Sequence, residues 1–266
     1  MSAAAAPNGV AAPEVLGAAA KFDYLLRLGD NCLVLAQQLG AWCGHGPALE
    51  EDMALTNVAL DLLGQAREWL SYAGEVEGAG RDEDALAYRR DGAAFRNLLL
   101  VELPNGDYGN TLMRQFLFDS WHHQVLAALV RSGDGRIAAI AGKAAKEVRF
   151  HVGRSSGLVV AWGDGTAQSH ERMQNALDHL WPYSNEWFLP DAVDDWCAAQ
   201  GIAPAAASLA GAWHASVDAV LARATLAKPS LTGHQKGGRL GQHTEHLGHL
   251  LTDLQFLQRA YPQAQW

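Results

Sequence analysis

Cysteine is scarce in this chain of 266 residues, and no two cysteines form a Cys-x-x-Cys pair. Only Cys32, Cys43 and Cys197 occur. An odd number of widely spaced cysteines provides no disulfide framework, and thiolate ligation of a metal needs a tighter group of them. The sequence therefore favours a reducing compartment, and we expect a cytoplasmic protein.

Charged residues are also few, at 18% of the chain, and acidic residues outnumber basic ones by 29 to 20. The formal net charge of -9 provides no broad positive surface for phosphate backbones or anionic lipids. We therefore expect no nucleic-acid partner and no membrane partner. Nine tryptophans distributed along the chain indicate extensive burial, part of which we expect to be against another subunit.

Long hydrophobic runs are missing, since none approaches the ~20 residues that a membrane-spanning helix needs. The first 20 residues have no basic start and no leucine-rich stretch, and two prolines interrupt them. This composition is not typical of a secretory signal peptide. We predict a disordered N-terminal arm over residues 1–20 and a single helical domain over residues 21–266.

Alternating β-branched segments are nearly absent too, so the sequence contains no clear strand signal. Apolar residues recur instead at steps of three and four, as in Leu25, Leu28, Cys32, Leu35 and Leu39. The same spacing predicts long helices over about 22–42, 50–73, 111–131 and 137–162, and a shorter element near 95–101.

Four long amphipathic helices with short or medium connections predict an all-α fold built on a four-helix bundle. We expect the bundle core over about 22–164 and additional C-terminal helices over about 169–260. Pro182 should end or kink the first of these additional helices, because proline removes a backbone donor and clashes with the preceding turn.

Four-helix bundles of this size often hold a carboxylate-bridged di-iron centre. Such a centre takes a Glu from each of two helices and a Glu-x-x-His from each of the others, since side chains three apart share a helix face. The second predicted helix has Leu62 and Gln65 at these two positions. Leucine has no donor atom and a glutamine carbonyl is a weak ligand, so this helix contributes no metal ligand.

The fourth predicted helix has Glu147 and His151, which are four residues apart rather than three, so the usual register is broken. On the other two helices the inward candidates are Asp30 and Asp119, with either His122 or His123 close to Asp119. We interpret six residues as positions of a degenerate di-iron site: Asp30, Leu62, Gln65, Asp119, Glu147 and His151.

These buried polar groups have two explanations. They can satisfy one another, Glu147 with His151 or Arg149 and Asp30 with a nearby cation, because paired charges are tolerated in a core. Alternatively, they bind metal through an unusual ligand set. A di-iron pair needs about four carboxylates and two histidines, more than this interior offers. We favour internal pairing and expect no catalytic residue, no metal and no cofactor on this chain.

A histidine cluster, His243, His246 and His249, stands at the start of the last predicted helix. His246 and His249 are three apart, a spacing that suits zinc, but a zinc site needs further convergent ligands. We favour helix capping and hydrogen bonds between helices or subunits for these side chains.

Several long stretches, in order along the chain, resemble one protein family. They are "YLLRLGDNCLVLAQQLGAWCGHGPALEEDMALTNVALDLLGQARE", "NLLLVELPNGDYGNTLMRQFLFDSWH", "KAAKEVRFH" and "HTEHLGHLLTDLQFLQRAYPQAQW". They resemble the structural, C-type subunits of the bacterial multicomponent phenylacetyl-CoA 1,2-epoxidases, the ring-activating oxygenases of phenylacetate degradation. The similarity covers nearly the whole chain from about Phe22 onward.

The resemblance implies a ferritin-like fold and a homologous A-type partner, which carries the working di-iron centre and binds the thioester. It also implies a small bridging B-type partner and an NADPH-dependent reductase with FAD and an iron-sulfur cluster. The C-type member is the structural one in this family. Its motif "DLLGQA" has Leu62 and Gln65 where a ligand-bearing "DEAGHG" type of sequence has Glu and His.

The segment "KPSLTGHQKGGRLGQ" places Lys236 and Arg239 among glycines ahead of the last helix. Basic loops near helix N-termini bind phosphate groups, so these two residues are candidates for contact with coenzyme A phosphates or with a protein partner. The alternative is an ordinary surface loop, because phosphate binding requires converging donors.

Two other functions remain open. One is an autonomous di-iron oxygenase that uses Asp30, Asp119, Glu147 and His151 as an unusual ligand set. The other is a free-standing helical binding protein without an oxygenase partner. Iron content separates the first from a structural subunit, and the association state separates the second.

Overall fold

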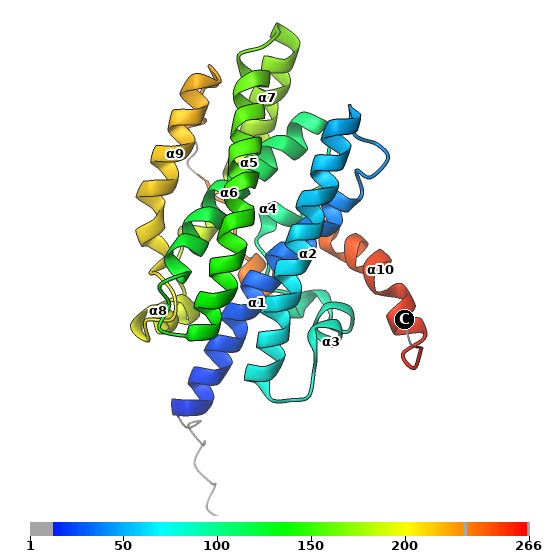
Figure 1. Cartoon of the computed structure of the whole chain (residues 1–266), viewed down its shortest axis with the longest axis vertical. Coiled ribbons are helices and arrows are strands. Elements are labelled where there is room, and N and C mark those ends of the chain that lie inside the picture. Colours follow the sequence, from blue (N-terminus) through cyan, green and yellow to red (C-terminus); the bar gives the residue numbers. More distant parts are fainter. Residues whose placement is uncertain (1–12, 231–232, 265–266) are drawn as a thin grey trace, which may run out of the picture.

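The computed structural model describes residues 13–230 and 233–264, and within these ranges every regular element is a helix. Four long helices dominate: α1 (Pro13–Gly40), α2 (Leu49–Glu77), α5 (Tyr108–Leu129) and α6 (Gly135–Gly163). α1 packs along α2, α5 packs along α6, and the two pairs meet where α2 contacts α6 (Figure 1). The all-α four-helix bundle predicted from the helical spacing is confirmed.

The helices begin and end where the sequence has capping residues. The carboxylate of Asp107 accepts a hydrogen bond from the backbone N–H of Asn110 at the start of α5, and Asp134 accepts from Arg136 and Ile137 at the start of α6. α2 ends at Gly78, whose φ of 68° lies in the left-handed region that glycine adopts without a steric penalty.

A crossover between α2 and α5 carries three short elements: α3 (Glu83–Tyr88), η1 (Gly92–Ala94) and α4 (Leu99–Glu102). The predicted element near residues 95–101 corresponds to α4. The last helix, α10 (Glu245–Ala260), packs on this crossover rather than on the bundle core, and it extends to one side of the molecule (Figure 1).

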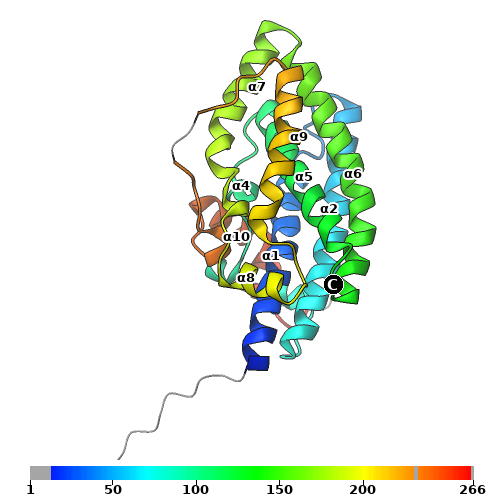
Figure 2. The same ribbon diagram turned by 90° about the vertical axis from the view of Figure 1, so that its left-hand side faces the viewer.

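The C-terminal half covers one side of the bundle. α7 (Ala167–Leu180) and α9 (Ala210–Arg223) pack on α5, and α8 (Ala192–Ala199) packs on α1 (Figure 2). α7 ends two residues before Pro182, as predicted. Short 3-10 turns connect these elements: η2 (Trp181–Tyr183), η3 (Glu186–Phe188), η4 (Ala206–Leu209) and η5 (Gly238–Leu240). Because α6, α7 and α9 all pack on α5, 17 of its 22 residues are buried, and it is the central helix.

The N-terminal boundary differs from the prediction. The sequence predicts an arm up to residue 20, but α1 begins at Pro13, so the assignment of residues 13–20 to the arm is wrong. Proline is well tolerated in the first turn of a helix, where its missing N–H has no partner in any case, and the alanines that follow have high helix propensity. Residues 1–12 lie outside the described residues.

In residues 13–230 and 233–264, no helix is both long and apolar enough to span a membrane. This finding agrees with the absence of long apolar runs in the sequence.

Ionic pairs join α2 to α6 along the line where the two helices meet. Acidic residues of α2 recur at about one per two turns and lie opposite basic residues or histidine on α6. The pairs are Glu51 with Arg154, Asp61 with His151, Glu68 with Lys143 and Glu75 with Arg136. Because most of these side chains are partly exposed, they fix the alignment of the two helices more than they add to stability.

Two helical glycines should respond oppositely to alanine. At Gly74 an added Cβ would lie 2.0 Å from the carbonyl oxygen of Arg81, whereas at Gly142 it would meet nothing within 4 Å. We expect Gly74→Ala to lower the free energy of unfolding by about 1–3 kcal/mol through overpacking. Gly142→Ala should raise it by about 0.5–1 kcal/mol through helix propensity. Chemical denaturation measures both, and equal effects of the two substitutions would contradict this packing.

Candidate metal centre in the bundle interior

One polar or thiol side chain from each long helix meets near the middle of the bundle. The amide Nε2 of Gln65 on α2 donates to Glu147 Oε2 on α6 at 2.9 Å. Cys32 on α1 lies with its Sγ 3.8 Å from Gln65 Oε1 and 4.0 Å from Nε2 of His122 on α5. We call these four residues the central polar layer.

Burial keeps two members of the central polar layer uncharged. It raises the pKa of the Cys32 thiol well above its ordinary value, with the charges of Glu147 and Asp30 adding to the effect. Burial also lowers the pKa of His122 to about 3, and His151 and His123 act in the same direction. A neutral thiol and a neutral imidazole are therefore present at neutral pH. The structure selects His122 rather than His123 as the buried histidine.

Asp119 belongs to a second group, next to the central polar layer. Its carboxylate accepts hydrogen bonds from Gln115 Nε2 at 2.6 Å and from Ser155 Oγ at 2.9 Å. Burial raises the pKa of Asp119 to about 6, although His151, Ser155 and Gln115 oppose the shift. Both carboxylate oxygens of Asp119 therefore already have a protein donor.

His151 is buried, and its side chain pairs with Asp61 on α2 rather than with Glu147. Its Nε2 donates to Asp61 Oδ2 at 2.9 Å, and its buried Nδ1 has no hydrogen-bond partner in the described residues. The expectation that Glu147 pairs with His151 or Arg149 is wrong, because Glu147 pairs with Gln65 across the bundle. Spacing on one helix cannot reveal a partner on another helix.

Asp30 is buried but does not take part in the central polar layer. Arg90 from the crossover forms an ion pair with both of its carboxylate oxygens, and the backbone N–H of Arg96 donates to Oδ2 at 2.8 Å. The expected pairing of Asp30 with a nearby cation is confirmed. Its interpretation as a metal-site position is not supported, because its carboxylate binds Arg90 and the backbone of Arg96 and so joins the crossover to α1.

The donors that are present do not fit a pair of irons. Leu62 is fully buried beside Gln65 and provides only an apolar wall. Asp119, Glu147 and His151 each bind a different protein group rather than pointing at a common centre. Within the described parts of the chain, no three His, Cys, Asp or Glu side chains come together in an arrangement suited to a metal ion.

A hollow of ≈ 150 Å³ lies between α2 and α6. Gln65 and Glu147 are among the residues that line it, together with Leu60, Gly64 and Ile140. The hydrogen bond between Gln65 and Glu147 can therefore be reached from outside the bundle.

The C-terminal histidines do not act together. His243 lies 2.7 Å from Glu102 through Nδ1 and 3.1 Å from the carbonyl of Phe95 through Nε2. Burial alone would lower the pKa of His243, but its hydrogen bond to Glu102 and the charge of Glu102 raise the pKa overall. This side chain joins the start of α10 to α4, which agrees with the predicted hydrogen-bonding role.

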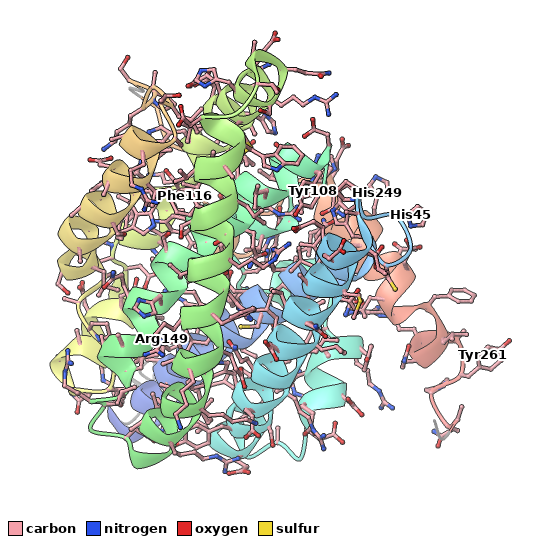
Figure 3. All side chains as sticks on the ribbon, turned by 45° about the horizontal axis from the view of Figure 1, so that its top comes forward. His45, Tyr108, Phe116, Arg149, His249 and Tyr261 are labelled. Carbon is pink, nitrogen blue, oxygen red and sulfur yellow. The ribbon has the colours of Figure 1, made fainter. Side chains whose placement is uncertain are left out.

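His246 and His249 instead line a surface groove of ≈ 470 Å³ between α10 and the end of α1. Figure 3 shows His249 near the inner end of α10 and Tyr261 at the outer end. In the described residues no third ligand of the kind that zinc needs joins this pair.

Arg239 differs from its predicted role. Its Nη1 lies 2.7 Å from Asp194 Oδ2, and its Nη2 donates to the carbonyls of Glu186 and Leu189. Because the guanidinium is engaged inside the protein, the expectation that Arg239 contacts coenzyme A phosphates is not supported. Lys236 is exposed, so its predicted contact stays a prediction. Residues 231–232 of the same segment lie outside the described residues.

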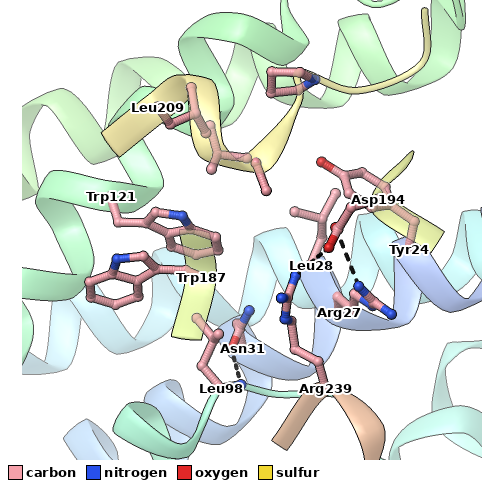
Figure 4. Close-up of a pocket in the computed structure, with 13 residues that line it drawn as sticks. Tyr24, Arg27, Leu28, Asn31, Leu98, Trp121, Trp187, Asp194, Leu209 and Arg239 are labelled. Atoms are coloured by element: carbon pink, nitrogen blue, oxygen red, sulfur yellow. Dashed lines mark hydrogen bonds and ion pairs between the residues drawn. The ribbon is translucent and has the colours of Figure 1, made fainter. Parts of the chain in front are cut away.

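Arg239 and Asp194 border an internal cavity of ≈ 40 Å³, together with Arg27 and a stacked pair of tryptophans, Trp121 and Trp187 (Figure 4). Such a volume has room for about one or two water molecules. It is too small for an aryl thioester.

Comparison with known proteins identifies the family of this chain. The family described as phenylacetic acid catabolic protein matches residues 11–266. The chain belongs to this family. It is 49% identical over 243 residues to the C subunit of the 1,2-phenylacetyl-CoA epoxidase of Escherichia coli (strain K12), across 91% of this chain and 98% of that protein.

Membership of the phenylacetic acid catabolic protein family confirms the resemblance seen in the sequence and the all-α, ferritin-like fold class. It supports a role in phenylacetate catabolism.

Two residues of the polar contacts described above, Cys32 and Asp61, were not identified from the spacing in the sequence. Asp61, Glu68 and Glu75 recur every seven residues on α2, and this repeat was the available signal for the pairs with α6.

Asp119 should make stability depend on pH with a defined sign. Because its pKa is raised from 3.8 to about 6 in the folded protein, folding favours the protonated form. The stabilisation is fully present below about pH 4 and is lost as the pH rises to about 6. His122, whose folded pKa is lowered, has the opposite dependence, so the wild type must be compared with Asp119→Asn.

We expect the difference in free energy of unfolding between wild type and Asp119→Asn to change by on the order of 2 kcal/mol between pH 4 and pH 6, with the wild type losing stability. Urea denaturation across this range measures it. A difference that does not vary with pH would contradict a buried carboxyl at this position.

Arg90→Met should leave Asp30 buried without its partner. Removing one member of a buried ion pair typically costs about 3–5 kcal/mol. The control is Arg67→Met, because the side chain of Arg67 is 77% exposed and pairs with Glu83 at 3.2 Å. We expect the control to stay within about 0.5 kcal/mol of wild type in urea denaturation. A similar small effect of Arg90→Met would show that the pair does not anchor the crossover.

Proposed function

We propose that this chain is the non-catalytic structural subunit of a multicomponent di-iron monooxygenase that epoxidises the aromatic ring of phenylacetyl-CoA. In this proposal it pairs with a homologous catalytic subunit, which holds the irons and the thioester. A small bridging subunit and an NADPH-dependent reductase with FAD and an iron-sulfur cluster complete the complex. The three free cysteines are the reason for placing it in the cytosol.

The hydrogen bond between Gln65 and Glu147 is the observation that carries the proposal. A di-iron centre requires carboxylates and imidazoles from all four helices. In this chain α2 has Leu62 and Gln65 at the two ligand positions, and the amide of Gln65 donates a hydrogen bond to the carboxylate of Glu147 on α6. The chemistry of oxygen activation therefore needs a second bundle with a complete ligand set.

A bundle without metal still has a mechanical use. Catalytic geometry must be held within about 0.5 Å by rigid elements. The largely buried α5 and the Asp30–Arg90 ion pair make this chain a stiff body. Packed against a catalytic subunit, it would restrict movements of the ligand-bearing helices.

The autonomous oxygenase is the alternative function. It requires Asp30, Asp119, Glu147 and His151 to release their present partners and converge on a metal. Asp30 would have to leave Arg90, and Asp119 would have to leave Gln115 and Ser155. The cost of leaving such buried groups unpaired argues against it. A free-standing binding protein is disfavoured by the extended similarity to a protein named as an enzyme subunit.

Iron content tests the proposal. The chain purified alone from iron-supplemented cells should contain far less than one iron per molecule. The complex with its homologous partner should contain about two irons per pair, as expected for one complete di-iron centre. Plasma emission spectrometry measures both. Near-stoichiometric iron in the isolated chain, with the absorption of an oxo-bridged centre, would favour the alternative.

Glu147→Gln tests the same question through turnover. The substitution keeps the shape, and the Gln65 amide can rotate so that a hydrogen bond remains. In the reconstituted complex we expect phenylacetyl-CoA epoxidation to stay within about threefold of wild type, since a residue outside the reaction centre affects kcat weakly. A loss of about a thousandfold would identify Glu147 as a metal ligand or catalytic residue.

A further inference from the structure

His243 stands just before the capping residue of α10, and both nitrogens of its imidazole face hydrogen-bond acceptors. Nδ1 lies 2.7 Å from Glu102 Oε2, and Nε2 lies 3.1 Å from the carbonyl oxygen of Phe95. A neutral imidazole has one N–H and can donate to only one of these acceptors, whereas an imidazolium donates to both. The contacts therefore fit the protonated form of His243.

Glu102 on α4 is fully buried, and donors surround its carboxylate. Oε1 accepts from the backbone N–H of Thr244 at 2.6 Å, and Oε2 accepts from Asn97 Nδ2 at 2.9 Å as well as from His243. Three donors on two oxygens favour the ionised carboxylate. The side chain of His243 is only 7% exposed, so the two residues form a buried ion pair at the start of α10.

Few other side chains bury α10. Of its 16 residues, Leu247, Leu251 and Gln255 are buried, and the amide of Gln255 donates to the carbonyls of Ala87 and Arg90 in the crossover. The helix packs on the crossover and extends away from the bundle (Figure 1). A helix with so few buried contacts opens more easily than the bundle core, so the ion pair at its start has a large influence on its docking.

The segment just before the ion pair is held by other contacts. A Cβ added at Gly238 or Gly241 would collide with the carbonyl oxygen of Asn97 or Ala93, so this segment lies directly on the backbone of the crossover. Arg239, between the two glycines, is bound inside the C-terminal half. These contacts do not involve His243. Movement of α10 can therefore begin after Gly241, whose φ is 77°.

Acidic groups from two helices act on the imidazole. Burial lowers the pKa of His243, but its hydrogen bond to Glu102, the charge of Glu102 and the charge of Asp30 on α1 raise it above its ordinary value overall. On α10 itself, Glu245 is exposed and His246 lines the surface groove. The acidic partner in direct contact with His243 is thus Glu102.

Two arginines of the crossover face the same place. Arg96 donates from Nη1 to the carbonyl of Phe95 at 2.8 Å, the same oxygen that His243 contacts, and its charge opposes that of the imidazolium. Asp23 on α1 pairs with Arg96 at 2.9 Å. The other arginine, Arg90, is paired with Asp30. Both positive charges therefore have their own carboxylates.

We propose that His243 and Glu102 form a proton-dependent latch, which docks α10 on the crossover and releases it when His243 loses its proton. Loss of the proton removes the ion pair and one of the two hydrogen bonds, and it leaves Glu102 buried without a cation. The groove between α10 and the end of α1, which His246 and His249 line, opens in the same step. The latch uses contacts within this chain, so it does not depend on the proposed function.

The direction of the pH dependence follows from the raised pKa of His243. The stabilisation by the latch is fully present below about pH 6.5, the ordinary pKa of histidine, and is lost as the pH rises through the higher pKa of the folded chain. Alkaline pH therefore loosens α10.

Hydrogen–deuterium exchange of the full chain at pH 6 and pH 9, corrected for the intrinsic effect of pH on exchange, measures the docking of α10. In the wild type the protection of amides 249–255 should fall at least about tenfold between these pH values, since a charge-assisted hydrogen bond is lost. Amides of α5 should keep their protection and serve as the internal reference.

His243→Gln removes the titrating group, so α10 should be weakly protected at both pH values. The matched control is His249→Gln, an exposed histidine on the same helix, which should retain the pH dependence of the wild type. A titration of the His243 ring in the wild type by NMR requires no substitution and should give a pKa above 6.5.

Equal protection of α10 at pH 6 and pH 9 in the wild type would overturn the latch, as would an unchanged pH dependence in His243→Gln. A His243 ring that is neutral at pH 6 would do the same. If the amides of α5 lose as much protection as those of α10, the change is global unfolding, and α10 does not respond separately.

Discussion

The hydrogen bond between Gln65 and Glu147 is the interaction on which the interior of this protein depends. It joins α2 to α6 within the central polar layer through two side chains alone. Glu147 is partly buried, and a carboxylate withdrawn from water is stabilised by a metal, a cation, a proton or hydrogen-bond donors. In this chain the side-chain amide of Gln65 is such a donor. The neutral Cys32 and His122 complete the layer without adding charge.

The other buried polar groups follow the same rule at separate places. Asp119 has Gln115 and Ser155, and Asp30 has Arg90. Each pair is local, so each stabilises one contact between two segments rather than a shared centre. The interior is therefore well suited to holding helices in a fixed arrangement. Membership of the phenylacetic acid catabolic protein family supports a role in phenylacetate catabolism.

The sequence predicted the helices well because their buried stripes are long and regular, as in Leu55, Val58, Leu62, Gln65 and Trp69 of α2. The prediction that α2 contributes no metal ligand needs only the chemistry of Leu62 and Gln65, and it stays a prediction. The sequence could not assign partners, because spacing along one helix carries no information about the helix opposite. Pairing Glu147 with His151 was wrong for this reason. The sequence alone could not predict the contacts of Arg239 either, because Asp194 and the backbone carbonyls that it binds come from other segments.

We propose that the di-iron centre of the epoxidase complex lies in a homologous subunit and not in this chain. Anomalous diffraction at the iron edge, from crystals of this chain assembled with that subunit, locates the irons. We expect a pair of anomalous peaks inside the partner bundle and none between Gln65, Asp119 and Glu147. A pair of peaks between these three residues would show that this chain holds the metal.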